Sequence, residues 1–392
     1  MDVAAILMVA SGQPVNAEDP TGLGLFAGVP FPVLDVLGRS PVLAIADALR
    51  NCGVQPSTLI VERRVYQLPE LRHLSHPGVT WVQSETGTLN RTTEEVFNNY
   101  CNQGAEFVLV LRLGPYTELD YGDLLRHHFV KRQHVTVVND VHGPLQIAVV
   151  NSNRRNDLAF LLRSSFAETR LASDRYIYSG YLNRLDNPSD LRNLARDGLL
   201  MRCNLRPAAE EVKPGVWIGR NVRLHQNARV LAPSFIGDHV KLRRSAVVTR
   251  CSSLEHHAEI GHETVVEDSS VMPYCCVGSG LDVDHAVVGF RHFAHLRRGV
   301  TVEITDGRLI SMAQASAPRR TLESAASLAT YVPGQLLRGF RDAFRPKSEN
   351  KTTHAELPEN FKPSVRPRVA GPASDMDELT GSFAIARDYG EQ

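Results

Sequence analysis

An aliphatic residue recurs at every sixth position through the middle of the chain, and this repeat constrains the fold more than any other feature. The positions are Ile218, Leu224, Val230, Ile236, Leu242, Val248, Leu254, Ile260, Val266 and Met272. Since about half of the residues in an average chain are apolar, this run has a chance probability on the order of 10⁻³. A second set, mostly of small side chains, follows four residues after each: Val222, Ala228, Ser234, Val240, Ala246, Ser252, Ala258, Thr264, Ser270 and Cys276. The repeat therefore belongs to the fold.

A period of six is neither helical nor the simple alternation of a single strand. A fixed hexad is typical of a parallel β-helix, in which the aliphatic residue points inwards and three hexads make one coil. Residues 18 apart should then stack at a spacing of about 4.8 Å. The hexads resemble those of the left-handed hexapeptide β-helix family. After Met272 the pattern slips by one residue, to Val277 and Val283.

Glycine follows the aliphatic residue directly in several hexads. The positions are Gly219, Gly237 and Gly261. Because a residue without Cβ takes a positive φ without strain, we expect these glycines to turn the corners of the coil.

The bulk composition limits the classes of partner. Among 392 residues, 43 acidic side chains balance 43 basic ones, so there is no net attraction to nucleic acid or anionic lipid. The six cysteines show no CxxC or CxxH spacing, and we interpret them as reduced structural residues. The apolar run at residues 3–10 is too short for a membrane span, and no basic residue precedes it. We therefore expect a cytoplasmic protein that binds no nucleic acid and has no transmembrane segment.

The first two hundred residues alternate strand-like and helix-like patterns. Strands are expected at 3–9, 58–61, 79–82 and 107–113, and a hairpin at 135–138 and 145–150. Helices are expected at 41–51, 92–102, 123–131 and 189–195. Ser40 is the N-cap of the first, a capping box at 92–95 begins the second, and Leu124, Leu125 and Phe129 should point inward from the third. This order predicts a mostly parallel sheet with helices on both faces. Ligands then bind at the carboxyl ends of the strands, in the loops after Val9 and Leu113.

Several segments of this half resemble the nucleotide-sugar pyrophosphorylases. Residues 31–43 look like their Pro-Lys-Pro segment, Gly87 and Thr88 like their Gly-Thr-Ala, residues 107–114 like their Gly-Asp, and 178–182 like their Asn-Ala-Gly-x-Tyr. The resemblance covers roughly residues 1–310 and implies a Rossmann-like nucleotidyltransferase domain at 1–205 and a left-handed parallel β-helix at 212–310. For residues 311–392 the composition predicts short helices and a largely disordered tail. The resemblance also implies candidates for the nucleotide pocket, which are Ala10, Gly12, Gly87, Thr88, Gly114 and Gly180.

The residues that would carry the chemistry of that family are replaced. Nucleotidyl transfer needs cations around the polyphosphate and a carboxylate that holds magnesium. Here no lysine or arginine precedes Arg39, while the first loop carries Glu18 and Asp19. Phe31 stands where the resemblance implies the lysine, and Pro115 stands where it implies the metal-ligating aspartate. Arg63 and Arg64, just past a predicted strand, are the alternative cations for a phosphate, and the simpler interpretation of both is a solvated loop. We therefore expect a pocket with no cation to meet a triphosphate.

The leading hypothesis is a protein that keeps the nucleotidyltransferase fold and has lost the triphosphate site. By resemblance it would be a regulatory or scaffolding subunit in sugar-nucleotide or polysaccharide metabolism, with a nucleotide sugar as candidate ligand. It would form homo- or hetero-oligomers through the β-helix. No cofactor is expected, and magnesium only if the site is active. An active but divergent sugar-phosphate nucleotidyltransferase is the alternative.

A second alternative comes from the histidines. Eight of the 15 lie between Leu224 and His295. Stacking predicts one column with Asn221, His239, His257 and Cys275, and a neighbouring column with Asp238, His256 and Tyr274. In a hexapeptide-repeat acyltransferase, His239 or His257 would be the catalytic base. The simpler interpretation is that they are polar turn positions on the outside of the coils.

The C-terminal segment from Gln335 to Phe344 has one apolar helical face with arginines opposite. It would pack on its own protein, on a membrane surface or on a partner. After Pro346 the composition is charged and proline-rich, which predicts disorder.

Overall fold

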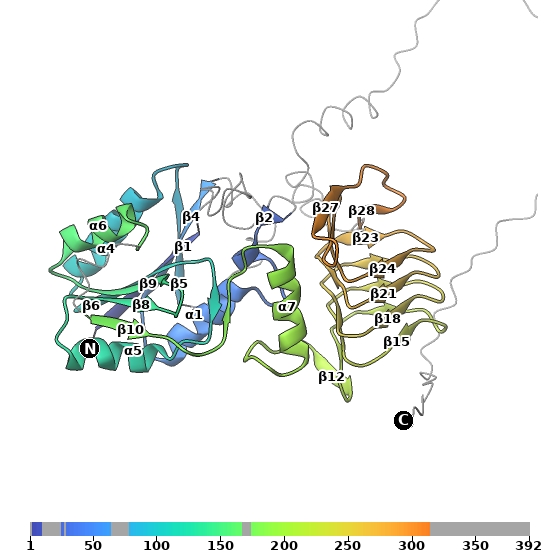
Figure 1. Cartoon of the computed structure of the whole chain (residues 1–392), viewed down its shortest axis with the longest axis horizontal. Coiled ribbons are helices and arrows are strands. Elements are labelled where there is room, and N and C mark those ends of the chain that lie inside the picture. The colour runs from blue at the N-terminus through green and yellow to red at the C-terminus, as the bar shows by residue number, and fades with distance from the viewer. Residues whose placement is uncertain (1, 10–24, 27–28, 64–77, 167–173, 314–392) are drawn as a thin grey trace, which may run out of the picture. The chain divides into compact units, whose positions relative to one another are not determined.

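The computed structural model describes residues 2–9, 25–26, 29–63, 78–166 and 174–313 (Figure 1). The chain divides into a compact unit at Met1–Tyr331 and a second unit at Val332–Gln392. The second unit, with the segment from Gln335 to Phe344, lies outside the described residues. So do the pocket candidates Ala10 and Gly12.

A seven-stranded, mostly parallel sheet forms the N-terminal part of the described chain. Its strands are β1 (Val3–Val9), β4 (Ser57–Glu62), β5 (Val79–Ser84), β6 (Phe107–Arg112), β8 (Val135–Asn139), β9 (Pro144–Asn151) and β10 (Asp174–Ile177), in the order β10-β8-β9-β6-β1-β4-β5. Only β9 runs antiparallel to its neighbours, β6 and β8. The predicted mixed α/β class with a mostly parallel sheet is therefore confirmed.

Helices cover both faces of this sheet. They are α1 (Pro41–Asn51), α4 (Leu89–Asn102), α5 (Tyr121–Val130), α6 (Arg155–Arg163) and α7 (Pro188–Leu199). Alternate residues of β1 enter two different cores, with Leu7 packing in the core that contains residues of α1, α5 and α7, and Ile6 in the core of α4 and α6. Because every residue of β1 is buried, the strand reads as a continuous apolar run.

Three helix boundaries and one inward residue differ from the prediction. Helix α4 begins at Leu89, before the predicted capping box, and the Thr92 hydroxyl instead donates to the carbonyl of Thr88 at 3.2 Å. Helix α5 begins after Asp120, and Phe129, predicted to point inward, is 53% exposed. Helix α7 extends to Leu199 through Gly198, where a Cβ would lie 2.6 Å from Leu37. Close packing explains that glycine.

Short elements connect the sheet to the rest of the chain. They are β2 (Leu25–Phe26), β3 (Val29–Pro30), the 3-10 helix η1 (Phe31–Val33), β7 (Tyr116–Thr117) and β11 (Leu182–Asn183). The helices of the described residues are too short or too polar to cross a lipid bilayer.

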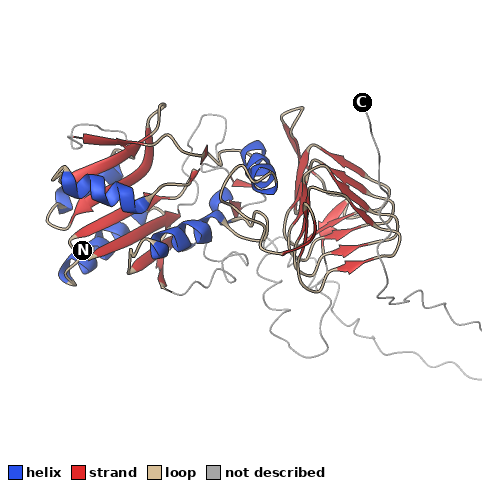
Figure 2. Cartoon of the chain, turned by 90° about the horizontal axis from the view of Figure 1, so that it is seen from below, coloured by secondary structure: helices blue, strands red, loops and turns tan. Residues whose placement is uncertain are grey.

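Residues 210–313, called the repeat region below, form three further sheets. The first contains β12 (Glu210–Lys213), β13 (Val216–Ile218), β16 (Ser234–Ile236), β19 (Ser252–Leu254), β22 (Ser270–Val271), β25 (Ala286–Gly289), β26 (His292–His295) and β27 (Val300–Glu303). The second contains β14 (Arg223–Leu224), β17 (Lys241–Leu242), β20 (Glu259–Ile260), β23 (Cys275–Val277) and β28 (Ile310–Met312). The third contains β15 (Arg229–Val230), β18 (Val247–Thr249), β21 (Val265–Glu267) and β24 (Asp282–Asp284). Figure 2 shows these short strands stacked in register.

The first repeats pair in parallel at the predicted separation of 18 residues. Ile218 pairs with Ile236, Leu224 with Leu242, and Val230 with Val248. From Ile236 to Val266 the aliphatic hexad residues are at most 2% exposed. The inward orientation predicted for them is confirmed.

The slip in the pattern occurs one hexad earlier than predicted. Leu254 pairs with Val271, so the separation falls to 17 and Val271, not Met272, takes the inward position. In the second set Ser269 likewise replaces Ser270, since the Ser269 hydroxyl donates to Val283 O as that of Ser252 donates to Val266 O. The physical cause is one residue fewer between Val266 and Val271.

The glycines after the aliphatic residues do not have the predicted positive φ. Positive φ falls two residues later, on Asn221 (55°) and His239 (60°). A Cβ at Gly219 would instead lie 2.4 Å from Asp238 Oδ1, and one at Gly237 would lie 2.8 Å from His256 N. Glycine is required because the next repeat approaches the backbone closely.

Candidate functional site

Six strands of the N-terminal sheet run parallel and therefore end at the same edge, called the carboxyl edge below. Ligands of open parallel sheets bind at such an edge. The loop after β1 lies outside the described residues, but those after β4, β5, β6, β8 and β10 contribute described residues. Four pocket candidates lie in these loops: Gly87, Thr88, Gly114 and Gly180.

These candidates have different local environments. A Cβ at Gly87 or Gly114 would meet no atom within 4 Å, so both face open space. The Thr88 hydroxyl donates to Glu85 O at 2.9 Å and pairs with Ser84 Oγ at 3.1 Å. At Gly180 a Cβ would lie 2.6 Å from the Tyr178 hydroxyl. Gly180 is thus explained by packing, while Gly87 and Gly114 leave room for a ligand.

The two positions where the resemblance implies charged groups are uncharged, and their surroundings differ. Phe31 is 1% exposed and belongs to the larger hydrophobic core. Pro115 is half-buried in the turn between β6 and β7. Because proline has no side-chain oxygen, this position does not fit a magnesium ion. A lysine at position 31 would have to leave the core to reach a ligand.

One cation at the carboxyl edge escaped the sequence-based expectation. Arg112 ends β6 and Glu62 ends β4, on either side of β1. Burial lowers the pKa of Arg112, against the opposing effect of the Glu62 carboxylate. The buried Nε of Arg112 has no hydrogen-bond partner among the described residues, whereas Glu62 Oε1 accepts the Gly87 N–H at 3.3 Å. The prediction of an edge without a cation is therefore wrong at Arg112, although Glu62 offsets its charge.

A polar groove of about 580 Å³ lies beside the loops that follow β8 and β10. Its lining residues are His142, Tyr181, Leu182, Asn183, Arg184, Asp190, Asn193, Arg196, Asp197 and Arg202. The Tyr181 hydroxyl donates to Asp197 Oδ2 at 2.8 Å, and Arg184 pairs with Asp140 at 2.9 Å. Within the described residues, the exposed side chain of Arg196 makes no hydrogen bond or ion pair. The groove thus offers an aromatic ring, hydrogen-bonding groups and one unpaired cation.

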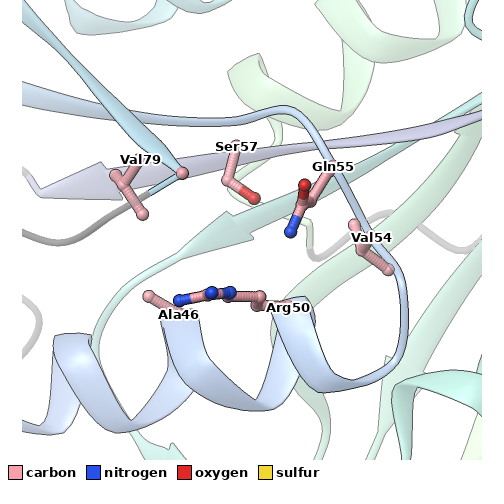
Figure 3. A pocket seen from close by; sticks show the side chains of 7 residues that line it. Ala46, Arg50, Val54, Gln55, Ser57 and Val79 are labelled. Carbon is pink, nitrogen blue, oxygen red and sulfur yellow. The ribbon is translucent and has the colours of Figure 1, made fainter.

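A second depression lies at the opposite edge of the sheet, between α1 and the first residues of β4 and β5 (Figure 3). It is lined by Ala46, Arg50, Val54, Gln55, Ser57, Gly78 and Val79. Its cavity volume is about 0 Å³, so the depression has no room for a ligand.

The histidine column in the repeat region differs in one member from the prediction. The rings of His239 and His257 stack at 4.6 Å, and those of His257 and Tyr274 at 4.7 Å. Tyr274 replaces the predicted Cys275, which is buried, because the slip shortens this repeat by one residue. The side chain of His257 thus lies between two rings.

The carboxylate beside these histidines also differs from the predicted one. Asp238 pairs with Arg220 at 2.7 Å. His256 Nε2 instead contacts Asp35 Oδ2 at 3.1 Å, and its Nδ1 lies 3.1 Å from His257 Nδ1. A carboxylate from the N-terminal part therefore holds the first of two linked imidazoles. Sequence spacing could not reveal this, because 221 positions separate Asp35 from His256 (256 − 35).

Comparison with known proteins adds no family to this geometry. A scan against models of protein families gives no match, and a search of curated proteins gives none either. Among the described residues, no group of three or more His, Cys, Asp and Glu side chains is arranged to hold a metal ion. The functional proposal below therefore rests on the carboxyl edge, the groove and the motifs of the sequence.

Proposed function

We propose that this chain is a nucleotidyltransferase-like protein that binds a nucleotide sugar without catalysing nucleotidyl transfer. It would act as a regulatory or scaffolding subunit in sugar-nucleotide or polysaccharide metabolism. The observation that carries the proposal is the charge at the carboxyl edge. Arg112 faces the balancing charge of Glu62, and Pro115 offers no ligand to a metal.

Nucleotidyl transfer places strict electrostatic demands on such an edge. A triphosphate concentrates negative charge, and its reaction needs several cations and usually a metal to neutralise the charge that develops. Among the described residues of this edge, Arg112 is opposed by Glu62, and Arg63, just after β4, pairs with Glu85 at 3.4 Å, so these arginines supply little of this. The edge remains suitable for a ligand with fewer charges.

The groove supports a carbohydrate ligand. Sugars are bound by many directed hydrogen bonds and by an aromatic ring, and Tyr181 and Asn193 provide such groups. Arg196 is available for one anionic group, such as a phosphate or carboxylate. Tyr181 also lies within the segment that resembles the Asn-Ala-Gly-x-Tyr motif.

The fold assignment is part of the same proposal. We assign the N-terminal part to a Rossmann-like nucleotidyltransferase domain and the repeat region to a left-handed parallel β-helix. Parallel pairing at 18 and then 17 residues supports the second assignment. The repeat region would mediate assembly into oligomers, because stacked repeats end in strands with unpaired edges.

Ligand binding is tested by thermal unfolding with a nucleotide sugar, a nucleoside triphosphate plus magnesium, or acyl-coenzyme A. A ligand at a hundred times its Kd adds about 2.7 kcal/mol to the folded state. We expect only the nucleotide sugar to raise Tm, and Arg196→Ala to weaken its binding. Arg229→Ala, an exposed arginine of β15 outside the groove, is the matched control.

The outcomes separate the alternatives. A shift with triphosphate and magnesium, together with release of pyrophosphate from triphosphate and sugar 1-phosphate, would favour the active nucleotidyltransferase. If a nucleotide sugar raises the Tm of wild type and of Arg196→Ala equally, the ligand does not bind in the groove. If no nucleotide sugar changes the Tm, the remaining role is that of a scaffolding subunit that senses no ligand.

Acyl transfer in the repeat region is a second candidate, favoured by the contacts of Asp35, His256 and His257. The Asp35 carboxylate contacts the His256 imidazole, which in turn contacts the His257 imidazole. Such an arrangement orients a general base. Release of free coenzyme A from acyl-coenzyme A plus an acceptor tests it. His257→Ala and His239→Ala would each have to abolish this release, and no release by wild type would reject the candidate.

A further inference from the structure

Glu255 is a buried carboxyl group that joins distant parts of the chain. It is 1% exposed and lies directly after β19 in the repeat region. Its Oε1 accepts the N–H of Leu37 at 2.9 Å, and its Oε2 accepts the N–H of Gly38 at 2.8 Å. Leu37 (φ 57°) and Gly38 (φ 79°) form a turn whose successive N–H groups point to the two oxygens of this carboxyl group.

The turn at residues 35–38 fits tightly against the repeat region. A Cβ at Gly38 would lie 3.0 Å from the Phe235 ring and 3.3 Å from Ala208. The Ala208 N–H donates to Leu37 O at 2.9 Å. The turn is therefore held by backbone hydrogen bonds and close packing, and water has little access to Glu255.

The charged groups around Glu255 come from both sides of this contact. Asp35 belongs to the turn and lies close enough to raise the pKa of Glu255. His256, the residue after Glu255, contacts the Asp35 carboxylate at 3.1 Å. Arg39, the residue after the turn, pairs with Asp47 of α1. The nearest charge acting on Glu255 is thus a like charge.

These surroundings favour the neutral acid. Burial, followed by Asp35, raises the pKa of Glu255 to about 8, against the opposing effect of the two N–H donors. An exposed glutamate has a pKa near 4.5, so the docked turn retains a proton that the open turn releases.

We propose that Glu255 and the turn at residues 35–38 form a proton-dependent docking contact between the N-terminal part and the repeat region. The contact is firm when Glu255 carries a proton. Opening exposes the carboxyl group to water, where the proton passes to solvent. The docked state consequently weakens as the pH rises from about 4.5 towards 8, and becomes insensitive to pH above 8, where Glu255 is ionised in both states.

The inference concerns a contact outside the groove and does not depend on a ligand. The turn belongs to the segment that resembles the Pro-Lys-Pro segment of the pyrophosphorylases and continues from Phe31 towards α1.

Amide hydrogen exchange of the full chain tests this contact between pH 6 and 9. The protection factor of an amide is its intrinsic exchange rate divided by its observed exchange rate at the same pH. For Leu37 and Gly38 we expect this factor to fall about tenfold per pH unit from 6 to 8 and to level off above 8. The amides of Val108–Leu111 in β6 serve as the internal control and should show no such bend.

Two variants decide whether Glu255 is responsible. Glu255→Gln cannot titrate, so its protection factors should be independent of pH. Asp35→Asn removes the like charge, so the bend should move to lower pH, and this variant keeps the test available if Glu255→Gln does not fold. A flat profile in wild type, or the same slope in wild type and Glu255→Gln, would overturn the proposal.

Discussion

Replacing Arg192 by alanine should destabilise the protein more than any other single arginine substitution in α7. The Arg192 side chain is only 3% exposed, and its Nη2 pairs with Asp268 Oδ1 at 2.6 Å. Its Nη2 and Nε also donate at 3.0 Å to the carbonyl oxygens of Cys251 and Asp268. These contacts join α7 to the repeat region.

The magnitude follows from the loss of one partner in a buried ion pair. Truncating one member leaves the other charge without compensation and costs about 3–5 kcal/mol. Unfolding entropy is about 2.1 cal/mol/K per residue, or about 0.7 kcal/mol/K for the unit of Met1–Tyr331. We therefore expect Arg192→Ala to lower Tm by about 4–7 °C.

Differential scanning calorimetry measures this shift, with Arg196→Ala as matched control. Arg196 lies one turn further along α7, is exposed and makes no ion pair among the described residues. Its loss should cost less than about 0.5 kcal/mol. A double-mutant cycle with Asp268→Asn should then give a coupling energy of more than about 1 kcal/mol. If Arg192→Ala melts within 1 °C of Arg196→Ala, the ion pair does not hold α7 against the repeat region.

Three further substitutions or conditions have defined outcomes. Burial lowers the pKa of His128, so the folded state binds fewer protons than the unfolded state. In urea unfolding, the free energy of unfolding should therefore decrease as the pH falls below about 6.5, and His128→Gln should remove this pH dependence. Gly237→Ala should cost more than about 2 kcal/mol in the same assay because its Cβ would lie 2.8 Å from His256 N, whereas Gly114→Ala, with no atom within 4 Å, should cost less than about 1 kcal/mol. Phe31→Lys should lower Tm by several degrees without producing pyrophosphate release, since it places an ammonium in the core; a stable variant with transferase activity would refute that interpretation.

The parts of the fold that could be predicted are those set by local periodicity. The run from Ile236 to Val266 determined both the inward residues and the 18-residue pairing, because each hexad repeats the same backbone path. The strands of the N-terminal sheet were found because fully buried parallel strands are continuous apolar runs.

The failures arose where two segments distant in the sequence meet. Val271 replaces Met272 because one residue is missing from that repeat, and both residues are apolar, so composition alone could not distinguish them. The hexad pattern predicts a positive φ at Gly237, but glycine is required there because the neighbouring repeat approaches the backbone closely. Side-chain contacts across sequence separations of this kind carry no periodic signal.

The same limit applies to the candidate site. Pro115 and Phe31 could be singled out from the motifs, but the cation Arg112 could not, because its relation to Glu62 depends on the strand order. The groove could not be predicted either, since it combines residues of the β8–β9 turn, β11 and α7. Of its members, only Tyr181 and Leu182 lie in a segment with a recognisable resemblance.

The release of pyrophosphate from a nucleoside triphosphate and a sugar 1-phosphate, with magnesium, tests the central claim most directly. The charge arrangement of Arg112, Glu62 and Pro115 predicts no release above background, while a nucleotide sugar still raises Tm. Release by wild-type protein that Arg112→Ala abolishes would contradict this account, because Arg112 would then be effective despite Glu62, at an edge where Pro115 cannot hold the metal.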